Sequence, residues 1–232
     1  MTTNGSSPTL AATEFLDHDS TEIRRFVDRV LGNADLSPKE QAVELYYAVR
    51  DDIFYDVYGI DISRTGLRAS SVATSGQGFC LHKSVLYAAA TRAVGVPSRL
   101  VFGDVRNHLA SGRLRDLVGG EIFFHALTAV YLDGRWVKAT PVFNKLLCKI
   151  YKLAPLEFDG NSDSMNHPFD DAGGARMEFL QLHGEFDDLP YEFVHHQLSA
   201  KHPAFVSGST TTLGGSLVTE ANSAVLSGDH HA

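Results

Sequence analysis

Cys80 and His125 are the two residues of this sequence whose types and settings suit thiol chemistry. Cys80 ends the stretch GQGFC, residues 76–80, and precedes an alanine-rich run with helical spacing. A cysteine at a helix N-terminus has its pKa lowered by the helix dipole and by free backbone N–H groups, and the thiolate is the nucleophilic form. His125 lies in the apolar segment IFFHALTAVYL and could serve as the general base for that thiol. The two residues therefore predict nucleophilic attack on a carbonyl compound.

Each of these residues also has a purely structural interpretation. Cys80 could be a small buried hydrophobe, and His125 could be a core histidine with a hydrogen-bond partner. The distance along the sequence does not show that the two side chains meet. The glycine turn and helix start favour the functional interpretation for Cys80. The other cysteine, Cys148, lies in KLLCKIY and is interpreted as one residue of an amphipathic helix.

Capping signals and hydrophobic spacing predict the helices that would position the cysteine. Ser37, Pro38 and Glu40 form an N-cap, a first-turn proline and a capping-box acid. The helix that follows Cys80 would be closed by Gly95 and Pro97. The predicted helices cover approximately residues 20–31, 38–52 and 80–94, followed by short helices over 145–153, 173–184 and 191–202.

The strands are predicted mainly after the Cys80 helix. Segments 122–132 and 135–143 are joined by Asp133 and Gly134, the residue pair that favours a type I′ hairpin turn. Segment 98–105 predicts a third strand, and 53–59 a short strand or extended stretch. The segment between this stretch and Cys80 is predicted to be a polar approach, and residues 107–121 a loop. His125 would therefore lie on the hairpin.

Composition favours one soluble domain and excludes several classes of partner. The chain has 232 residues, 44% of them hydrophobic, and a formal net charge of -8. Its 20 lysines and arginines form no basic run, so neither nucleic acid nor an anionic membrane is expected as a partner. No signal peptide or membrane-spanning stretch is predicted, and two cysteines suit a reducing compartment, so we expect a cytoplasmic protein. The 11 histidines form no metal-binding motif, and neither a metal nor a cofactor is predicted.

Motifs in the right order resemble those of the transglutaminase-like superfamily of papain-like thiol enzymes. They are GQGFC, an alanine-rich helix, GVPSRLV, and then FHALTAVYLDGRWVKATP, within residues 40–145. The resemblance implies that Cys80 is the nucleophile and His125 the general base and acid. It also implies structural roles for Trp136 and Arg99.

The sequence departs from this family at one position. The family usually orients its histidine with an aspartate on the following strand, whereas this chain has Thr140 there. Asn144 could hold the imidazole through its side-chain carbonyl, as an amide does in papain-like enzymes, or Thr140 could do so through its hydroxyl. Either neutral residue could support catalysis.

The resemblance further implies an oxyanion site, formed by the backbone N–H of Cys80 and a donor from the preceding loop. We nominate the Gln77 side chain as that donor, although it could also be an exposed turn residue. Asp104 and His108 are expected at the rim of the cleft, and Phe124, beside His125, is expected to contact the substrate. For His108, a solvated loop is the alternative.

The acidic segment 157–174 raises the question of a calcium site. Asp159, Asp163 and Asp170 lack the order of an EF-hand loop and its bidentate glutamate. We therefore interpret the segment as a solvated loop folded against the core, which could act as a lid that sets substrate choice. His195 and His196 are interpreted as surface residues.

The sequence thus predicts an α+β fold in which N-terminal helices and the Cys80 helix pack on an antiparallel sheet that carries His125. The expected domain covers residues 17–206, with a disordered segment at 1–16 and a flexible tail at 207–232. The predicted reaction is hydrolysis or acyl transfer from a small-molecule or peptide amide, or another activated carbonyl, through an acyl-cysteine. The size of the chain favours a hydrolase or small-molecule acyltransferase over a protein cross-linker. A catalytically silent binding module with this fold is the alternative.

Overall fold

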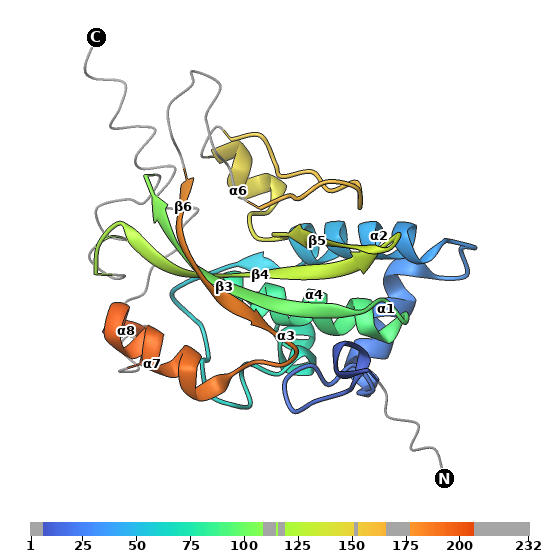
Figure 1. Cartoon of the computed structure of the whole chain (residues 1–232), viewed down its shortest axis with the longest axis horizontal. Helices are drawn as coiled ribbons and strands as arrows, with labels where there is room; N and C mark the ends of the chain where they lie inside the picture. The colour runs from blue at the N-terminus through green and yellow to red at the C-terminus, as the bar shows by residue number, and fades with distance from the viewer. Residues whose placement is uncertain (1–6, 109–114, 116–118, 151–152, 166–176, 207–232) are drawn as a thin grey trace.

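The structure is a computed structural model that describes residues 7–108, 115, 119–150, 153–165 and 177–206. Helices precede the sheet in the chain, and further helices follow it (Figure 1). The helical elements are η1 (Pro8–Leu10), α1 (Thr21–Leu31), α2 (Pro38–Asp52), α3 (Ala69–Ser75), α4 (Cys80–Ala93), α6 (Lys145–Ile150), α7 (Tyr191–Lys201) and α8 (Pro203–Val206). The strands are β1 (Phe54–Tyr55), β2 (Gln77–Gly78), β3 (Ser98–Asn107), β4 (Ile122–Leu132), β5 (Arg135–Ala139) and β6 (Met177–Phe186).

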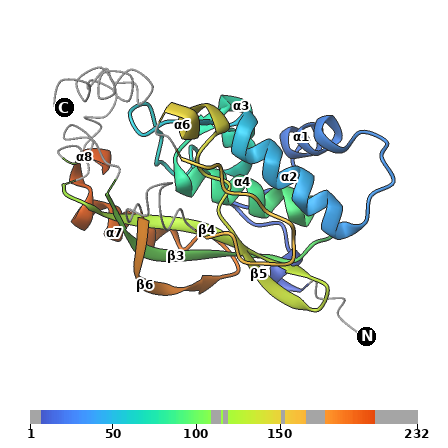
Figure 2. The ribbon, with the colours of Figure 1, turned by 90° about the horizontal axis from the view of Figure 1, so that it is seen from above.

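Helix α4, which begins at Cys80, lies in the middle of the molecule. It packs against α1, α2 and α3 and against strands β3 and β4. Figure 2 shows these helices together on one face of the sheet. Nearly all of α4 is buried, including Lys83 and Arg92. Its small alanines therefore allow close approach of helices on one side and the sheet on the other.

The main sheet is antiparallel and has the strand order β5-β4-β3-β6. Its β4–β5 hairpin turns at Asp133 and Gly134, whose φ values of 48° and 83° suit a type I′ turn. The predicted hairpin and the predicted α+β class are confirmed. The predicted helices at residues 20–31, 38–52 and 80–94 are also confirmed to within two residues. The helices expected after Asn144 and around 191–202 correspond to α6 and α7.

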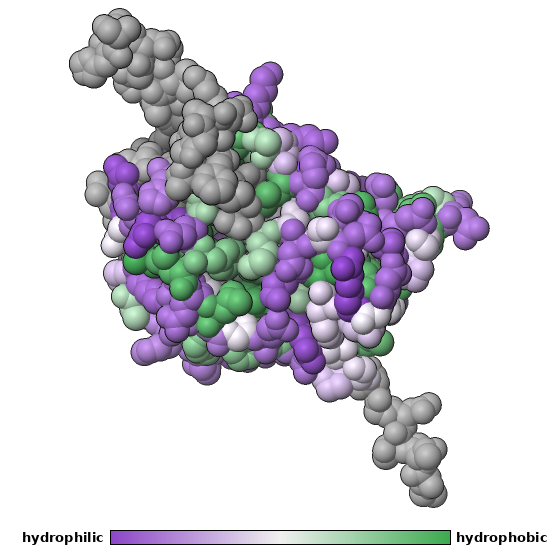
Figure 3. All heavy atoms as spheres, turned by 45° about the horizontal axis from the view of Figure 1, so that its top comes forward, coloured by the Kyte–Doolittle hydropathy of each residue, from purple (hydrophilic) through white to green (hydrophobic). Residues whose placement is uncertain are grey.

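Strand β4 has apolar residues on both faces. Ala126 and Val130 belong to the main core under the helices, whereas Leu127 and Ala129 belong to a second apolar cluster with Val101. The partly buried side chains of Trp136, Met165 and Phe179 pack against this second cluster. Figure 3 shows apolar and polar side chains in alternating patches on the surface that it presents.

Two predictions about local structure are wrong. Within 173–184, predicted to be helical, the described residues form strand β6, which pairs with β3 through two register irregularities. The sequence MEFLQLHGEF fits both the helical period of 3.6 residues and the strand period of two residues. Pairing with the open edge of β3 decides in favour of the strand. In the polar approach before Cys80, the structure has helix α3, which ends at the left-handed Gly76.

The predicted disorder of residues 1–16 is wrong for its described part, residues 7–16. Phe15 and Leu16 are buried, and the backbone N–H of Ala69 donates to Phe15 O. Arg92 Nη1 donates to Ala11 O at 2.6 Å, which ties the segment to α4. Residues 1–6 and the predicted tail at 207–232 lie outside the described residues.

No helix in the described part of the chain combines the length and apolarity needed to cross a bilayer.

Gly78, two residues before Cys80, has no room for a side chain. A Cβ atom there would lie 2.4 Å from His82 Cβ and 2.8 Å from His82 Cγ, both in the first turns of α4. Because α4 is buried on all sides, we expect Gly78→Ala to lower the free energy of unfolding by about 1–3 kcal/mol. Urea denaturation checks this. Gly59→Ala is the control, because its Cβ would meet only the ends of the Asp56 and Gln77 side chains, and equal losses in both variants would contradict the steric argument.

Candidate functional site

Cys80 and His125 line the same small pocket. Cys80 is the first residue of α4, and His125 lies in β4 opposite Gly103 of β3. Each is 5% exposed. The space inside has room for about one water molecule. Most of the other lining residues are apolar, among them Tyr55, Val57, Phe79, Phe123, Val142 and Phe143.

Burial decides the charge states in this pocket. Desolvation raises the pKa of the Cys80 thiol to about 11, although the backbone N–H groups of Ala126, Leu81 and Cys80 itself oppose the shift. Desolvation also lowers the pKa of His125 to about 4. The predicted acidic thiol is therefore wrong for this closed state, because removal from water outweighs the N–H groups of the helix start. At neutral pH the pocket holds a thiol and a neutral imidazole.

The structure gives the thiol and the imidazole no hydrogen bond to one another. Within the described residues, the His125 ring has one aromatic contact, edge-on to Phe179 with centroids 5.8 Å apart. A second small cavity, which Cys80 does not line, is lined by His125, Thr140, Val142 and Met177 among others. His125 thus lines both small cavities.

Thr140 follows β5 directly and lies in this second cavity with His125. It is 3% exposed, and its Oγ1 has no hydrogen-bond partner among the described residues. A buried hydroxyl without a partner costs stability unless some group uses it. Thr140 is therefore the polar side chain that the fold leaves free beside His125.

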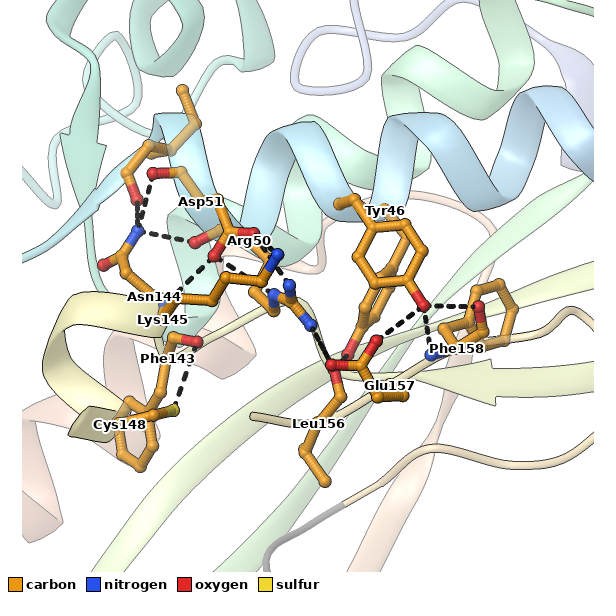
Figure 4. Close-up of polar contacts among 12 residues, drawn as sticks. Tyr46, Arg50, Asp51, Phe143, Asn144, Lys145, Cys148, Leu156, Glu157 and Phe158 are labelled. Carbon is orange, nitrogen blue, oxygen red and sulfur yellow. Dashed lines mark hydrogen bonds and ion pairs between the residues drawn. The ribbon is translucent and has the colours of Figure 1, made fainter. Parts of the chain in front are cut away.

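Asn144 is committed to a different task (Figure 4). Its Oδ1 accepts a hydrogen bond from Tyr55 N at 2.9 Å, and its Nδ2 donates to Arg50 O, Asp51 O and Ile53 O at 2.5–3.2 Å. Both ends of the amide are thus occupied by the end of α2 and the start of β1. Asn144 is absent from the residues that line either cavity, so the hypothesis that it orients His125 does not fit this geometry.

The other predicted site residues are dispersed. Gln77 is exposed, donates weakly to Gly59 O at 3.5 Å, and does not line the pocket. Asp104 accepts from Lys201 Nζ at 2.5 and 2.6 Å and pairs with His183 Nε2 at 3.1 Å, so its carboxylate is already occupied. His108 is exposed in the turn that follows β3. The buried Phe124 does line the pocket.

In the acidic segment, Asp159 forms a turn rather than a metal site. Its Oδ1 accepts from Asn161 N and Ser162 N, while Phe158 is buried against Tyr46 in the core. No cluster of three metal-ligating side chains occurs in the residues that the structure describes. Asp170 and the second half of this segment, from residue 166, lie outside them.

A comparison with protein-family models decides the relationship. The model of the transglutaminase-like superfamily matches residues 24–141, just over half of the 232 residues, and this range includes both Cys80 and His125. The chain belongs to the transglutaminase-like superfamily. The predicted resemblance to this superfamily is thereby confirmed.

Two solved structures are similar to this chain. A proposed cysteine protease from Cytophaga hutchinsonii is 16% identical with a TM-score of 0.46, over 77% of this chain and 53% of that one. A proposed protease from Parabacteroides distasonis is 17% identical with a TM-score of 0.38, over 57% of this chain and 26% of that one. This chain therefore spans about half the length of the first. No curated protein matches the sequence.

Sequence reasoning missed one polar residue of the pocket, His202. It is 1% exposed, lines the pocket with Cys80 and His125, and accepts a hydrogen bond from Phe124 N at 2.9 Å. The signal was the sequence Lys201-His202-Pro203: a proline ends the preceding helix, so the residue before it lies at a bend. No motif of the superfamily points to this position.

The contacts of Asn144 predict a structural effect of its removal. Asn144→Ala should lower the free energy of unfolding by about 2–4 kcal/mol, because Tyr55 N and several carbonyls lose a buried partner. Urea denaturation measures this loss, with exposed Asn33→Ala as the control of matched chemistry. A stable Asn144→Ala protein that had lost only reactivity at Cys80 would instead support the role of orienting His125.

Burial of His125 also predicts a pH dependence of stability. Its pKa is about 4 in the folded state against 6.5 ordinarily, so the unfolded chain binds the proton first as pH falls. The free energy of unfolding should therefore drop between pH 6.5 and 4, and His125→Gln should reduce this drop by about 3 kcal/mol. Urea titrations across this range test the difference. Exposed His196→Gln is the matched control for the substitution itself. A pH profile that stays the same in His125→Gln would contradict the burial argument.

Proposed function

We propose that this protein is a thiol hydrolase or acyltransferase in which Cys80 is the nucleophile and His125 the general base and acid. The observation that carries the proposal is that these two residues, far apart in the sequence, line one pocket in a chain of the transglutaminase-like superfamily. The substrate would be an amide or another activated carbonyl of a small molecule or peptide. No cofactor is needed.

The neutral pair is a workable starting point for the reaction. As substrate enters, the Cys80 thiol gives its proton to His125, and the thiolate attacks the carbonyl carbon to form a tetrahedral adduct. The imidazolium returns the proton to the leaving group, the carbon–leaving-group bond breaks, and an acyl-cysteine remains. Water or an amine then attacks this thioester while His125 takes up its proton, and Cys80 is released as a thiol.

Two neighbours would assist this chemistry. The backbone N–H of Cys80, at the first turn of α4, has no partner within the helix and is the oxyanion donor that we retain. Gln77 is left out, because its side chain is exposed and outside the pocket. Thr140 takes the part of the orienting residue, since its free buried hydroxyl shares a cavity with His125. A hydroxyl can accept the N–H of a neutral imidazole and so select its tautomer.

The closed pocket implies that the walls move when substrate binds. A space for about one water cannot hold an acyl group together with its leaving group. The reaction should therefore depend on opening, and small acyl donors should react first.

The test is acylation of Cys80 by 4-nitrophenyl acetate, followed by peptide mass spectrometry at neutral pH. Wild type should gain an acetyl group on Cys80, while the buried Cys148 serves as the internal control. His125→Ala should slow the acylation by about 100-fold or more, because it removes the base. Thr140→Val should slow it by a smaller factor, because it removes only the group that orients the base. Cys80→Ser controls for acetylation elsewhere.

Two outcomes would count against this function. Equal labelling of Cys80 and Cys148 would mean that the pocket confers no reactivity. No labelling of Cys80 at any pH between 6 and 10 would favour the catalytically silent binding module, which has no need of a reactive thiol.

A further inference from the structure

The backbone of β4 has an open edge beside the nucleophile. Tyr131 N donates to Pro97 O, on the β3 side of the strand. Because donors alternate along an antiparallel strand, the even-numbered N–H groups of β4 point to the β5 side. Of the β4 residues that pair with β5, Thr128, opposite Ala139, is the farthest from the hairpin turn. Beyond this pair, the N–H groups of Ala126 and Phe124 have no strand partner on that side.

Both donors face groups of the pocket. The N–H of Ala126 faces the Cys80 thiol. The N–H of Phe124 donates to His202 Nε2 at 2.9 Å. His202 thus takes the place of the missing strand at the residue directly before His125. Since its Nε2 accepts, the proton of the neutral ring is on Nδ1.

Contacts on both sides of His202 hold it in this place. Lys201, the preceding residue, forms an ion pair with Asp104 of β3, and His183 of β6 contacts the same carboxylate. Pro203 begins α8, and His202 N donates to Leu198 O at 2.7 Å, which closes α7. The ring is therefore fixed by α7, α8 and the sheet together rather than by its own bond alone.

We infer that His202 is a positioning residue for the reaction: it fixes the open edge of β4 at Phe124 and thereby sets where His125 stands relative to Cys80. This role rests on the proposed function of Cys80. His202 need not exchange a proton with the substrate. Its contribution is geometric, and a displacement of about 1 Å in such a site can cost about 100-fold in rate.

The experiment compares His202→Leu with His202→Gln, using 4-nitrophenyl acetate as the acyl donor. Leucine fills space but accepts no hydrogen bond, whereas the Oε1 of glutamine can accept from Phe124 N. We expect His202→Leu to slow acylation of Cys80 by about 10- to 100-fold and His202→Gln to recover most of the rate. Exposed His196→Leu, within α7, controls for changes to that helix.

Amide hydrogen exchange provides a readout that packing alone would not move. The Phe124 amide should exchange faster than in wild type in His202→Leu and about as slowly as in wild type in His202→Gln. The exchange rate of the Leu127 amide, which faces β3, should be unchanged in both variants. The inference is overturned if His202→Leu acylates Cys80 at the wild-type rate. It is also overturned if His202→Gln acylates Cys80 as slowly as His202→Leu although its Phe124 amide is protected from exchange. If wild-type Cys80 is not acylated, the proposed function fails, and the catalytic role of His202 fails with it.

Discussion

The buried C-terminal end of α2 is the constraint on which the arrangement of the site depends. Its last carbonyls have no helical partners and lie away from water, so other parts of the chain must supply donors. Lys83 Nζ donates to Arg50 O and Ile53 O at 2.9 and 2.7 Å, and Asn144 Nδ2 donates to the same two oxygens. Lys83 is one turn beyond Cys80, and Asn144 is four residues beyond Thr140. One cluster therefore fixes both helix α4, which begins at Cys80, and the segment after Thr140.

This cluster consists of groups that cannot be exchanged independently. Lys83 is fully buried, and desolvation holds its pKa well below the usual lysine range. Arg50, also fully buried, donates to Leu156 O at 2.7 Å and pairs with Asp51 and Glu157 (Figure 4). Because these groups bind backbone atoms of α2 and of the segment after α6, the loss of one donor would leave a buried acceptor without a partner. The framework around the pocket is consequently rigid on the α2 side.

The features of the fold and site that could be predicted from the sequence are those set by residues close together in the chain. The turn at Asp133 and Gly134, the capping box at Ser37 and the helix start at Cys80 are set by neighbours in the sequence, and all three were predicted correctly. Strand β6 was missed because its conformation comes from pairing with β3. The role of Asn144 and the position of His202 come from contacts with residues 94 and 78 positions away, which spacing along the chain does not reveal. The raised pKa of Cys80 is likewise a result of tertiary burial that overrides its local setting.

The same burial gives a physical reason for threonine at the position where the superfamily usually has aspartate. At 3% exposure, a carboxylate at residue 140 would need a charged or strongly donating partner, and the cavity it shares with His125 is otherwise lined by apolar residues. His125 could provide that charge only as an imidazolium, yet burial lowers its pKa to about 4. A neutral hydroxyl beside a neutral imidazole and a neutral thiol avoids an isolated charge in the closed pocket. Charge would then develop only when a substrate arrives with a carbonyl oxygen and a leaving group to share it, which ties reactivity at Cys80 to occupancy of the site.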